Sequence, residues 1–192
     1  PHNEKISVLN DRSNIWETYD AVISTLPAPQ NLDLMKKFPI LKKTLETASY
    51  DACIALMFIF DDKPTNIPHF FEYYNQQGML SWMAAGSNLR FWTAQTKGDY
   101  SNKNINKDKI LLKDEIFQEI EKAIYQLEPN IKINFHSLHI WKYAKVTKVC
   151  SGPQIDPKFP IVVAGDFMEG ASVESAFSSG EKAAELILER LN

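Results

Sequence analysis

The hydrophobic pattern predicts strands near the start, in the middle and toward the end of the chain. Residues 6–9 and 15–19 flank a turn-forming stretch and predict a β-hairpin. Residues 50–60 are rich in Ile, Phe and Met and predict a long strand. Aromatic and apolar residues cluster over 69–96, where two glycines punctuate them, and predict two or three antiparallel strands. Residues 131–146 alternate and predict a further extended strand.

Other stretches have helical spacing. Residues 31–38 and 39–48 predict two short helices, the second with a proline suited to a first helical turn. Residues 111–127 predict an amphipathic helix. One face of that helix is expected to carry Leu112, Ile116, Ile120, Ala123 and Leu127. The polar residues 99–108 predict a loop.

Two apolar segments lack alternation, which is typical of strands covered on both faces in a parallel sheet. The first is the centre of residues 20–29, where Pro27 and Pro29 end the strand and exclude its direct continuation as a helix. The second is residues 161–164. Each of the two segments is therefore predicted to be a buried strand of the parallel type.

The second apolar segment leads into the most informative part of the chain. Gly165-Asp166 and a glycine-containing loop follow it, and a long helix is predicted from Val173. The apolar positions that keep helical spacing are Ala176, Phe177, Gly180, Ala184, Ile187, Leu188 and Leu191. The carboxyl ends of parallel strands and the amino ends of helices are where α/β sheets bind electron-rich ligands. The same pattern also fits an ordinary strand-to-helix turn with Ser172 as the helix cap, and the two interpretations have about even weight.

Composition and charge narrow the function classes. The formal net charge of −3 argues against a protein that mainly grips nucleic acid. The longest apolar run, residues 52–60, is too short to cross a bilayer, and no leader segment precedes it. The two cysteines form no disulfide framework or metal-ligand spacing, so a cytoplasmic location is expected. The start at Pro1 makes a piece of a longer polypeptide the expectation.

Three blocks resemble the FAD-dependent amine oxidases, most closely the renalase-like branch. Residues 165–180, which include Gly165-Asp166, resemble the carboxyl-terminal flavin-binding motif of that family. Residues 20–29 resemble the strand that re-enters its FAD domain. Residues 141–144 resemble its Trp-Arg-Tyr strand, with Lys142 in place of the usual arginine.

The resemblance implies a fold class and a division of the chain. It implies an α+β or α/β protein in which an antiparallel-sheet substrate domain joins the last strand and helix of a Rossmann-like FAD domain. Residues 1–29 would be the hairpin and the returning strand, residues 30–150 the substrate domain, and residues 151–192 the FAD-binding strand, loop and helix. The Gly-x-Gly-x-x-Gly fingerprint that opens this family is absent, so a fragment that is inactive by itself is expected.

The resemblance also implies residue roles. The residues expected to contact FAD are Thr25, Leu26, Pro27, Gly165, Asp166, Ala171, Ser172 and Val173. Those expected to contact an amine or reduced nicotinamide substrate are Trp82, Trp141 and Tyr143. Trp92 is a further candidate, although core packing is the simpler role for any one of these aromatic residues. The intact protein would transfer hydride from substrate to flavin and be reoxidised by oxygen, with no catalytic side chain identified.

A metal site is not expected, because His136 and His139 are three apart on a strand and therefore lie on opposite faces. Three other functions stay open: a freestanding, non-catalytic binding module, another flavoprotein such as a desaturase or mutase, and a different nucleotide-binding α/β protein. The face that a missing half would cover is also a candidate homodimer contact.

Overall fold

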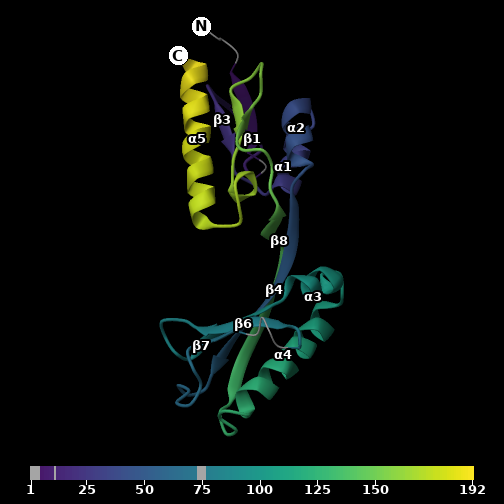
Figure 1. Ribbon diagram of the computed structural model, residues 1–192, viewed down its shortest axis with the longest axis vertical. Coiled ribbons are helices and arrows are strands. Elements are labelled where there is room, and N and C mark those ends of the chain that lie inside the picture. The colour runs from purple at the N-terminus through teal and green to yellow at the C-terminus, as the bar shows by residue number, and fades with distance from the viewer. Residues whose placement is uncertain (1–4, 11, 73–76) are drawn as a thin grey trace. The chain divides into compact units, whose positions relative to one another are not determined.

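The computed structural model describes residues 5–10, 12–72 and 77–192, and it divides into two compact units. The first unit consists of Pro1–Tyr50 and Val146–Asn192, and the second of Asp51–Lys145. Two long strands, β4 (Ser49–Phe60) and β8 (Ile133–Lys148), run from one unit into the other (Figure 1). In this division residues 30–50 belong to the first unit, whereas the resemblance grouped them with residues 51–150.

The first unit begins with the predicted hairpin. Strands β1 (Ile6–Asn10) and β2 (Ile15–Tyr19) pair antiparallel, with Leu9 opposite Trp16. The turn between them contains Asn14 at φ 54°, a conformation that asparagine tolerates better than most residues. The hairpin prediction is confirmed.

A separate three-stranded sheet has the order β3-β10-β9. Its strands are β3 (Val22–Ser24), β10 (Ile161–Val163) and β9 (Gln154–Ile155). β3 and β10 are parallel, with Ile23 opposite Val162, and β10 is wholly buried. Both non-alternating apolar segments are therefore parallel strands, as predicted. The predicted burial holds for β10, whereas Ile23 of β3 is 39% exposed.

Helices cover both faces of this sheet (Figure 1). On one face α5 (Val173–Leu191) packs Ala183 and Ile187 against Val162 and Ala164. On the other face, α1 (Ala28–Leu34) and α2 (Pro39–Leu45) join Ile161, Val163 and the 3₁₀ turn η1 (Asp166–Met168) in a second apolar cluster. The unit is thus a three-layer α/β arrangement.

The limits of α1 correct the sequence prediction. The helix begins at Ala28 rather than at Asn31, after the three residues that follow β3, with Pro27 as its cap and Pro29 in its first turn. Proline is tolerated there because the first N–H groups of a helix have no intrahelical acceptor. The prolines therefore start the helix rather than exclude it.

The predicted face of α5 also needs correction. Of the seven apolar positions expected on one face, only Ile187 is buried, and the buried positions are Ser179, Ala183 and Ile187. The helix therefore packs on β10 through a neighbouring stripe, in which Ser179 and Ala183 are small residues and Ile187 is a large one.

The second unit contains a five-stranded sheet of order β5-β6-β7-β4-β8. The strands not yet given are β5 (Phe70–Glu72), β6 (Leu80–Ala85) and β7 (Phe91–Thr96). β5, β6, β7 and β4 pair antiparallel in turn, with a bulge in β6 between Leu80 and Trp82. The predicted antiparallel strands are confirmed.

One face of this sheet packs on α4 (Lys109–Tyr125). Asp108 caps the helix, and its carboxylate accepts from the backbone N–H groups of Ile110 and Leu111. The buried positions of α4 are Leu112, Ile116, Ile120 and Ile124. The predicted face is correct for the first three; Ala123 is only half-buried, and Leu127 lies beyond the end of the helix and is exposed.

The loop predicted over residues 99–108 is wrong in its first half, where α3 (Gly98–Asn104) forms. Its polar residues make tertiary hydrogen bonds. The Ser101 and Thr96 hydroxyl oxygens lie 2.7 Å apart, and the Asn102 side chain accepts from the backbone N–H of Ala52 at 2.8 Å. Burial of satisfied polar groups, rather than an apolar stripe, holds this helix in place.

Candidate functional site

The strand-to-helix connection of the first unit is built around Gly165. This residue has φ +152°, and a β-carbon there would lie 2.5 Å from Cε1 of Phe167. Only glycine therefore permits the Phe167 ring to fold back under the turn into the core. Asp166 then opens η1, and Gly170, at φ +155°, leads toward α5.

α5 begins with the predicted cap. The Ser172 hydroxyl accepts from the backbone N–H of Ser175 at 3.0 Å. Helix geometry leaves the N–H groups of Val173 and Glu174 without intrahelical acceptors, and the helix dipole adds partial positive charge there. The predicted Ser172 cap is confirmed, and Val173, the first helical residue after it, lines a pocket.

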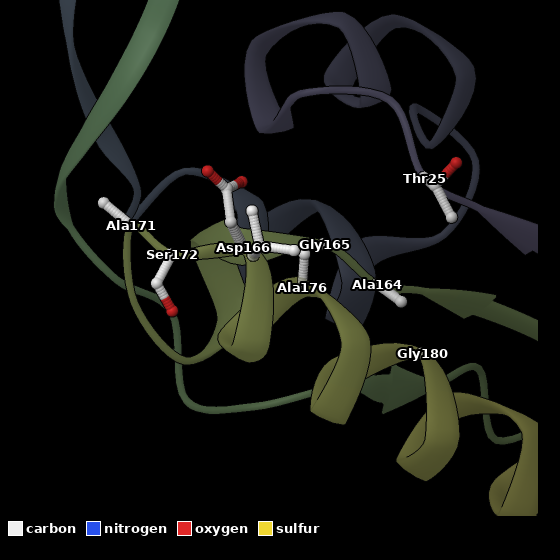
Figure 2. A pocket seen from close by; sticks show the side chains of 9 residues that line it. Thr25, Ala164, Gly165, Asp166, Ala171, Ser172, Ala176 and Gly180 are labelled. Atoms are coloured by element: carbon white, nitrogen blue, oxygen red, sulfur yellow. The ribbon is translucent and has the colours of Figure 1, made fainter.

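That pocket has a volume of about 580 Å³ (Figure 2). Its lining consists of Thr25, Ala164, Gly165, Asp166, Ala171, Ser172, Val173, Ala176 and Gly180. Six of the eight residues expected to contact FAD are among them, whereas Leu26 and Pro27 follow Thr25 without lining the cavity. Figure 2 shows the Asp166 carboxylate projecting from its turn, with Thr25 contributed by the segment after β3.

Asn31 fixes the turn that carries Thr25. It is fully buried, its side-chain N–H donates to the carbonyl of Leu26 at 2.5 Å, and its side-chain oxygen accepts from the Ser24 hydroxyl at 2.5 Å. Sequence reasoning missed Asn31. An asparagine within a predicted helix, seven residues after a strand serine, was the available signal.

Tyr50 supports the same segment. Its phenolic oxygen accepts from the backbone N–H of Ala28, the first residue of α1, at 3.0 Å. Burial raises the pKa of Tyr50 to about 12, and the Asp166 carboxylate adds to the rise, against the opposing effect of the Ala28 hydrogen bond. The phenol is therefore protonated at neutral pH.

Two further contacts hold the loop to α5. The backbone N–H of Gly165 donates to the buried Ser179 hydroxyl at 2.9 Å. Lys182 Nζ lies 2.6 Å from Glu169 Oε1. A hydrogen bond from Lys182 lowers the pKa of Glu169, and a hydrogen bond from Ser178 lowers it further by a smaller amount. The pocket wall is thus fixed by side chains that do not themselves line it.

The predicted substrate-contacting residues lie in the second unit. Met83 packs in the α4-side core, as do Leu138 and Ile140. Because side chains alternate along a strand, Trp82, Trp141 and Tyr143 belong to the sheet face away from α4. Trp82 contacts Phe70, with ring centroids 6.3 Å apart, and lines a hollow of about 430 Å³.

The remaining ring residues of this unit have simpler roles. The Trp92 side chain is 2% exposed and packs with Phe58 and Phe60, so its core role is confirmed.

The two histidines of β8 lie on opposite faces of the sheet, as predicted. The ring of His136 stacks on that of Phe117 of α4, with centroids 4.1 Å apart, whereas the ring of His139 contacts that of Trp141, with centroids 4.3 Å apart. Burial lowers the pKa of His136. Over the described part of the chain, no three His, Cys, Asp or Glu residues gather as a possible metal site.

No protein-family model matches this chain, and no curated protein matches it by sequence. Solved structures, in contrast, match the chain by fold. A crystal structure of an oxidoreductase from Methanosarcina mazei superposes with a TM-score of 0.57 at 16% identity, covering 90% of this chain and 44% of that one. A crystal structure of reduced UDP-galactopyranose mutase superposes with a TM-score of 0.52 at 13% identity, covering 93% of this chain and 42% of that one.

These comparisons concern the fold. The chain spans less than half the length of either structure. Within the residues that the structure describes, no helix has the length and apolar character needed to cross a membrane. Over most of its length the chain shares its fold with parts of these two longer proteins.

Proposed function

We propose that the chain is the carboxyl-terminal part of an FAD-dependent oxidoreductase and that its first unit supplies one wall of the FAD site. The observation that carries the proposal is the pocket between the carboxyl ends of β3 and β10 and the amino end of α5. Six residues selected from sequence for FAD contact line that pocket. The likeness in fold to the Methanosarcina mazei oxidoreductase supports the same conclusion.

The donor and acceptor groups of the pocket suit a flavin dinucleotide. The Asp166 carboxylate has the acceptor chemistry for ribityl or ribose hydroxyl groups. The N–H groups of Val173 and Glu174, with the dipole of a 19-residue helix behind them, suit a ring edge that gains negative charge on reduction. Thr25, Leu26 and Pro27 would approach the phosphate side. Bound FAD would supply the redox chemistry, and these residues would orient it.

We further propose a renalase-like or amine-oxidase reaction for the complete protein. The substrate would be an amine or a reduced nicotinamide that gives up two electrons as a hydride, and oxygen would take these electrons with two protons to give hydrogen peroxide. Trp82, Trp141 and Tyr143 offer ring faces for a flat substrate. Tyr143 and Trp141 are 38% and 55% exposed, so their rings are accessible.

The likeness to UDP-galactopyranose mutase favours a second candidate, a sugar-nucleotide mutase with the same cofactor. The two reactions differ in their electron balance. An oxidase consumes oxygen and substrate in equal amounts, whereas a mutase isomerises its substrate without net electron transfer. Oxygen consumption with an amine or reduced nicotinamide as substrate therefore distinguishes them.

A titration of FAD into the complete polypeptide, followed by flavin fluorescence, tests the FAD site. Asp166→Ala removes the proposed hydroxyl acceptor, so FAD affinity is expected to fall about tenfold or more. Asp33→Ala is the matched control, since Asp33 lies on α1, is exposed and pairs with exposed Lys36 at 2.9 Å. Equal FAD affinity in the two variants would contradict the assigned role of Asp166.

A further inference from the structure

The five-stranded sheet of the second unit has an open face, the one that points away from α4, and this face carries exposed apolar side chains. Leu56 and Phe58 of β4 belong to the core on the α4 side, so alternation places Met57 and Ile59 on the open face. Met57 is 42% exposed although β4 lies between β7 and β8. Phe91, opposite Ile59 on β7, is 49% exposed. Apolar side chains left exposed in the middle of a sheet are typical of a binding surface.

A hollow of about 380 Å³ lies among these side chains. Its lining includes Met57, Ile59 and Phe91, together with Thr93 and Ser137. None of the described residues that line it carries a charge. A hollow with this lining favours a hydrocarbon group, because burial of each methylene group adds to affinity and no charged partner is offered. We call it the apolar hollow.

A second hollow, of about 430 Å³, has a different lining, and we call it the charged hollow. The ionic groups among the described residues that line it are Lys97, Lys145 and Asp51. The Asn102 side chain donates to the Asp51 carboxylate at 2.7 Å, so one acceptor position of the aspartate is already used. Gln95 adds an amide donor to the lining. Two ammonium groups against one carboxylate favour an anionic group in this hollow.

The two hollows lie at different levels of the same strands. On β4, Met57 lines the apolar hollow and Asp51 lines the charged hollow, and the six residues of strand between them span about 20 Å. On β8, Ser137 lines the apolar hollow and Lys145 the charged one. Trp141 stands midway between these two positions, and its ring is 55% exposed. The open face therefore changes from apolar to charged along the strands, with an accessible ring between the two ends.

We propose that the open face binds one elongated amphipathic molecule, whose anionic group occupies the charged hollow and whose hydrocarbon chain passes Trp141 into the apolar hollow. The extended chain of hexadecanoate spans about the distance between the hollows. An amine or a reduced nicotinamide held by ring faces makes no use of the apolar hollow, so the inference adds a long hydrocarbon part to the substrate class. It rests on the proposed function only in treating this molecule as the substrate.

The shape and charge of the surface favour a single amphipathic molecule over a lipid bilayer. Both ends of the surface are hollows, whereas a protein that binds a bilayer inserts projecting apolar side chains into it. The formal net charge of −3 also opposes attraction to anionic lipid headgroups. A bilayer is therefore an outcome that the experiment has to distinguish.

Calorimetric titration of the complete polypeptide with three amphipathic probes tests the proposal. The probes are hexadecanoate, octanoate and hexadecyltrimethylammonium, each kept below the concentration at which it aggregates. Hexadecanoate is expected to bind about tenfold or more tightly than octanoate, which has half the chain, because fewer methylene groups are buried. It is also expected to bind about tenfold or more tightly than the ammonium compound, whose charge has the wrong sign for two lysines.

Two variants test the two ends of the surface separately. Met57→Asp should weaken hexadecanoate binding about tenfold or more, since it places a charge in the apolar hollow. Lys145→Ala should weaken it about threefold to fivefold, as expected for an exposed ion pair. Leu111→Asp and Lys109→Ala are the matched controls, because both residues are exposed on α4 behind the sheet, and they should leave the affinity unchanged. Met57→Gln replaces the aspartate variant if that variant melts at a lower temperature.

The other outcomes overturn the proposal or separate it from the proposed function. Equal affinity for octanoate and hexadecanoate would overturn the apolar hollow as a binding site, and equal losses in variants and controls would overturn its location. Sedimentation with phosphatidylglycerol vesicles, without binding of monomeric hexadecanoate, would identify a lipid surface instead. Hexadecanoate binding by a polypeptide that retains no flavin would uphold the site while contradicting the proposed function. Flavin retention without hexadecanoate binding would overturn the site alone.

Discussion

The backbone N–H of Gly165 donates to the side-chain oxygen of Ser179, 2.9 Å away and fourteen residues later in the chain. The bond ties the end of β10 to the second turn of α5, and Ser179 is fully buried. It therefore fixes the position of the amino end of α5 relative to the turn that carries Asp166. The polar groups proposed to face FAD depend on a serine that does not touch the cavity.

Replacement of the buried Ser179 by alanine should remove the acceptor of the half-buried Gly165 N–H. We expect the free energy of unfolding to fall by about 1–3 kcal/mol. Urea denaturation followed by circular dichroism measures this. Ser7→Ala, in an exposed strand position of β1, is the control and should change stability by less than about 0.5 kcal/mol. Equal stability of the two variants would mean that the Gly165–Ser179 bond contributes nothing.

Gly165→Ala combines an unfavourable backbone conformation with a collision against Phe167. Gly152 is the matched control, because it also has a positive φ, +90°, but nothing lies within 4 Å of its would-be β-carbon. We expect Gly152→Ala to cost about 1 kcal/mol of unfolding free energy and Gly165→Ala clearly more. The double variant Gly165→Ala/Phe167→Leu should recover part of the difference. Equal losses at the two glycines would show that the Phe167 contact is unimportant.

Asn31→Ala should loosen the turn that carries Thr25. The Leu26 carbonyl and the Ser24 hydroxyl both lose their partner, so we expect a loss of about 1–3 kcal/mol in unfolding free energy. Gln30→Ala changes the preceding, exposed residue and should be close to neutral. Thermal unfolding of both variants measures the difference. A neutral Asn31→Ala would refute the positioning role of this residue.

The Glu169–Lys182 pair predicts a pH dependence of stability. The hydrogen bond from Lys182 lowers the folded-state pKa of Glu169 below its ordinary value of 4.5. The stabilisation is therefore fully present above pH 4.5 and is lost as the pH falls through the lower, folded-state pKa. Lys182→Met should make the decline in melting temperature on acidification shallower. An unchanged pH profile in Lys182→Met would show that the pair does not couple to folding.

Sequence patterns predicted the elements whose stability is local. The β1–β2 hairpin, the β10-to-α5 connection and most of α4 follow from alternation, caps and helical spacing. α3 was missed because its stability comes from hydrogen bonds of Ser101 and Asn102 to a distant strand. The side of α5 that packs on the sheet was missed because periodicity shows which residues share a face. It does not show which of two adjacent faces a neighbour covers.

The candidate pocket was predictable in part, because some of its residues lie close together in the sequence. Gly165, Asp166 and Ser172 follow one another along a single connection, so the sequence places them together. Thr25 joins them through the parallel pairing of β3 with β10. The apolar segments predicted two strands of the parallel type but not that they pair with each other. Ser179 and Tyr50 act through hydrogen bonds to residues distant in the sequence, and no local pattern identifies such partners.

A visible absorption spectrum of the complete polypeptide, recorded after incubation with FAD and desalting, tests the central claim most directly. The account predicts flavin bands that survive desalting, and a cofactor that elutes as FAD after denaturation. It also predicts that residues 1–192 alone lose the bands, because one wall of the site cannot retain the cofactor. A complete polypeptide that stays colourless would contradict the FAD site and favour a non-catalytic binding module.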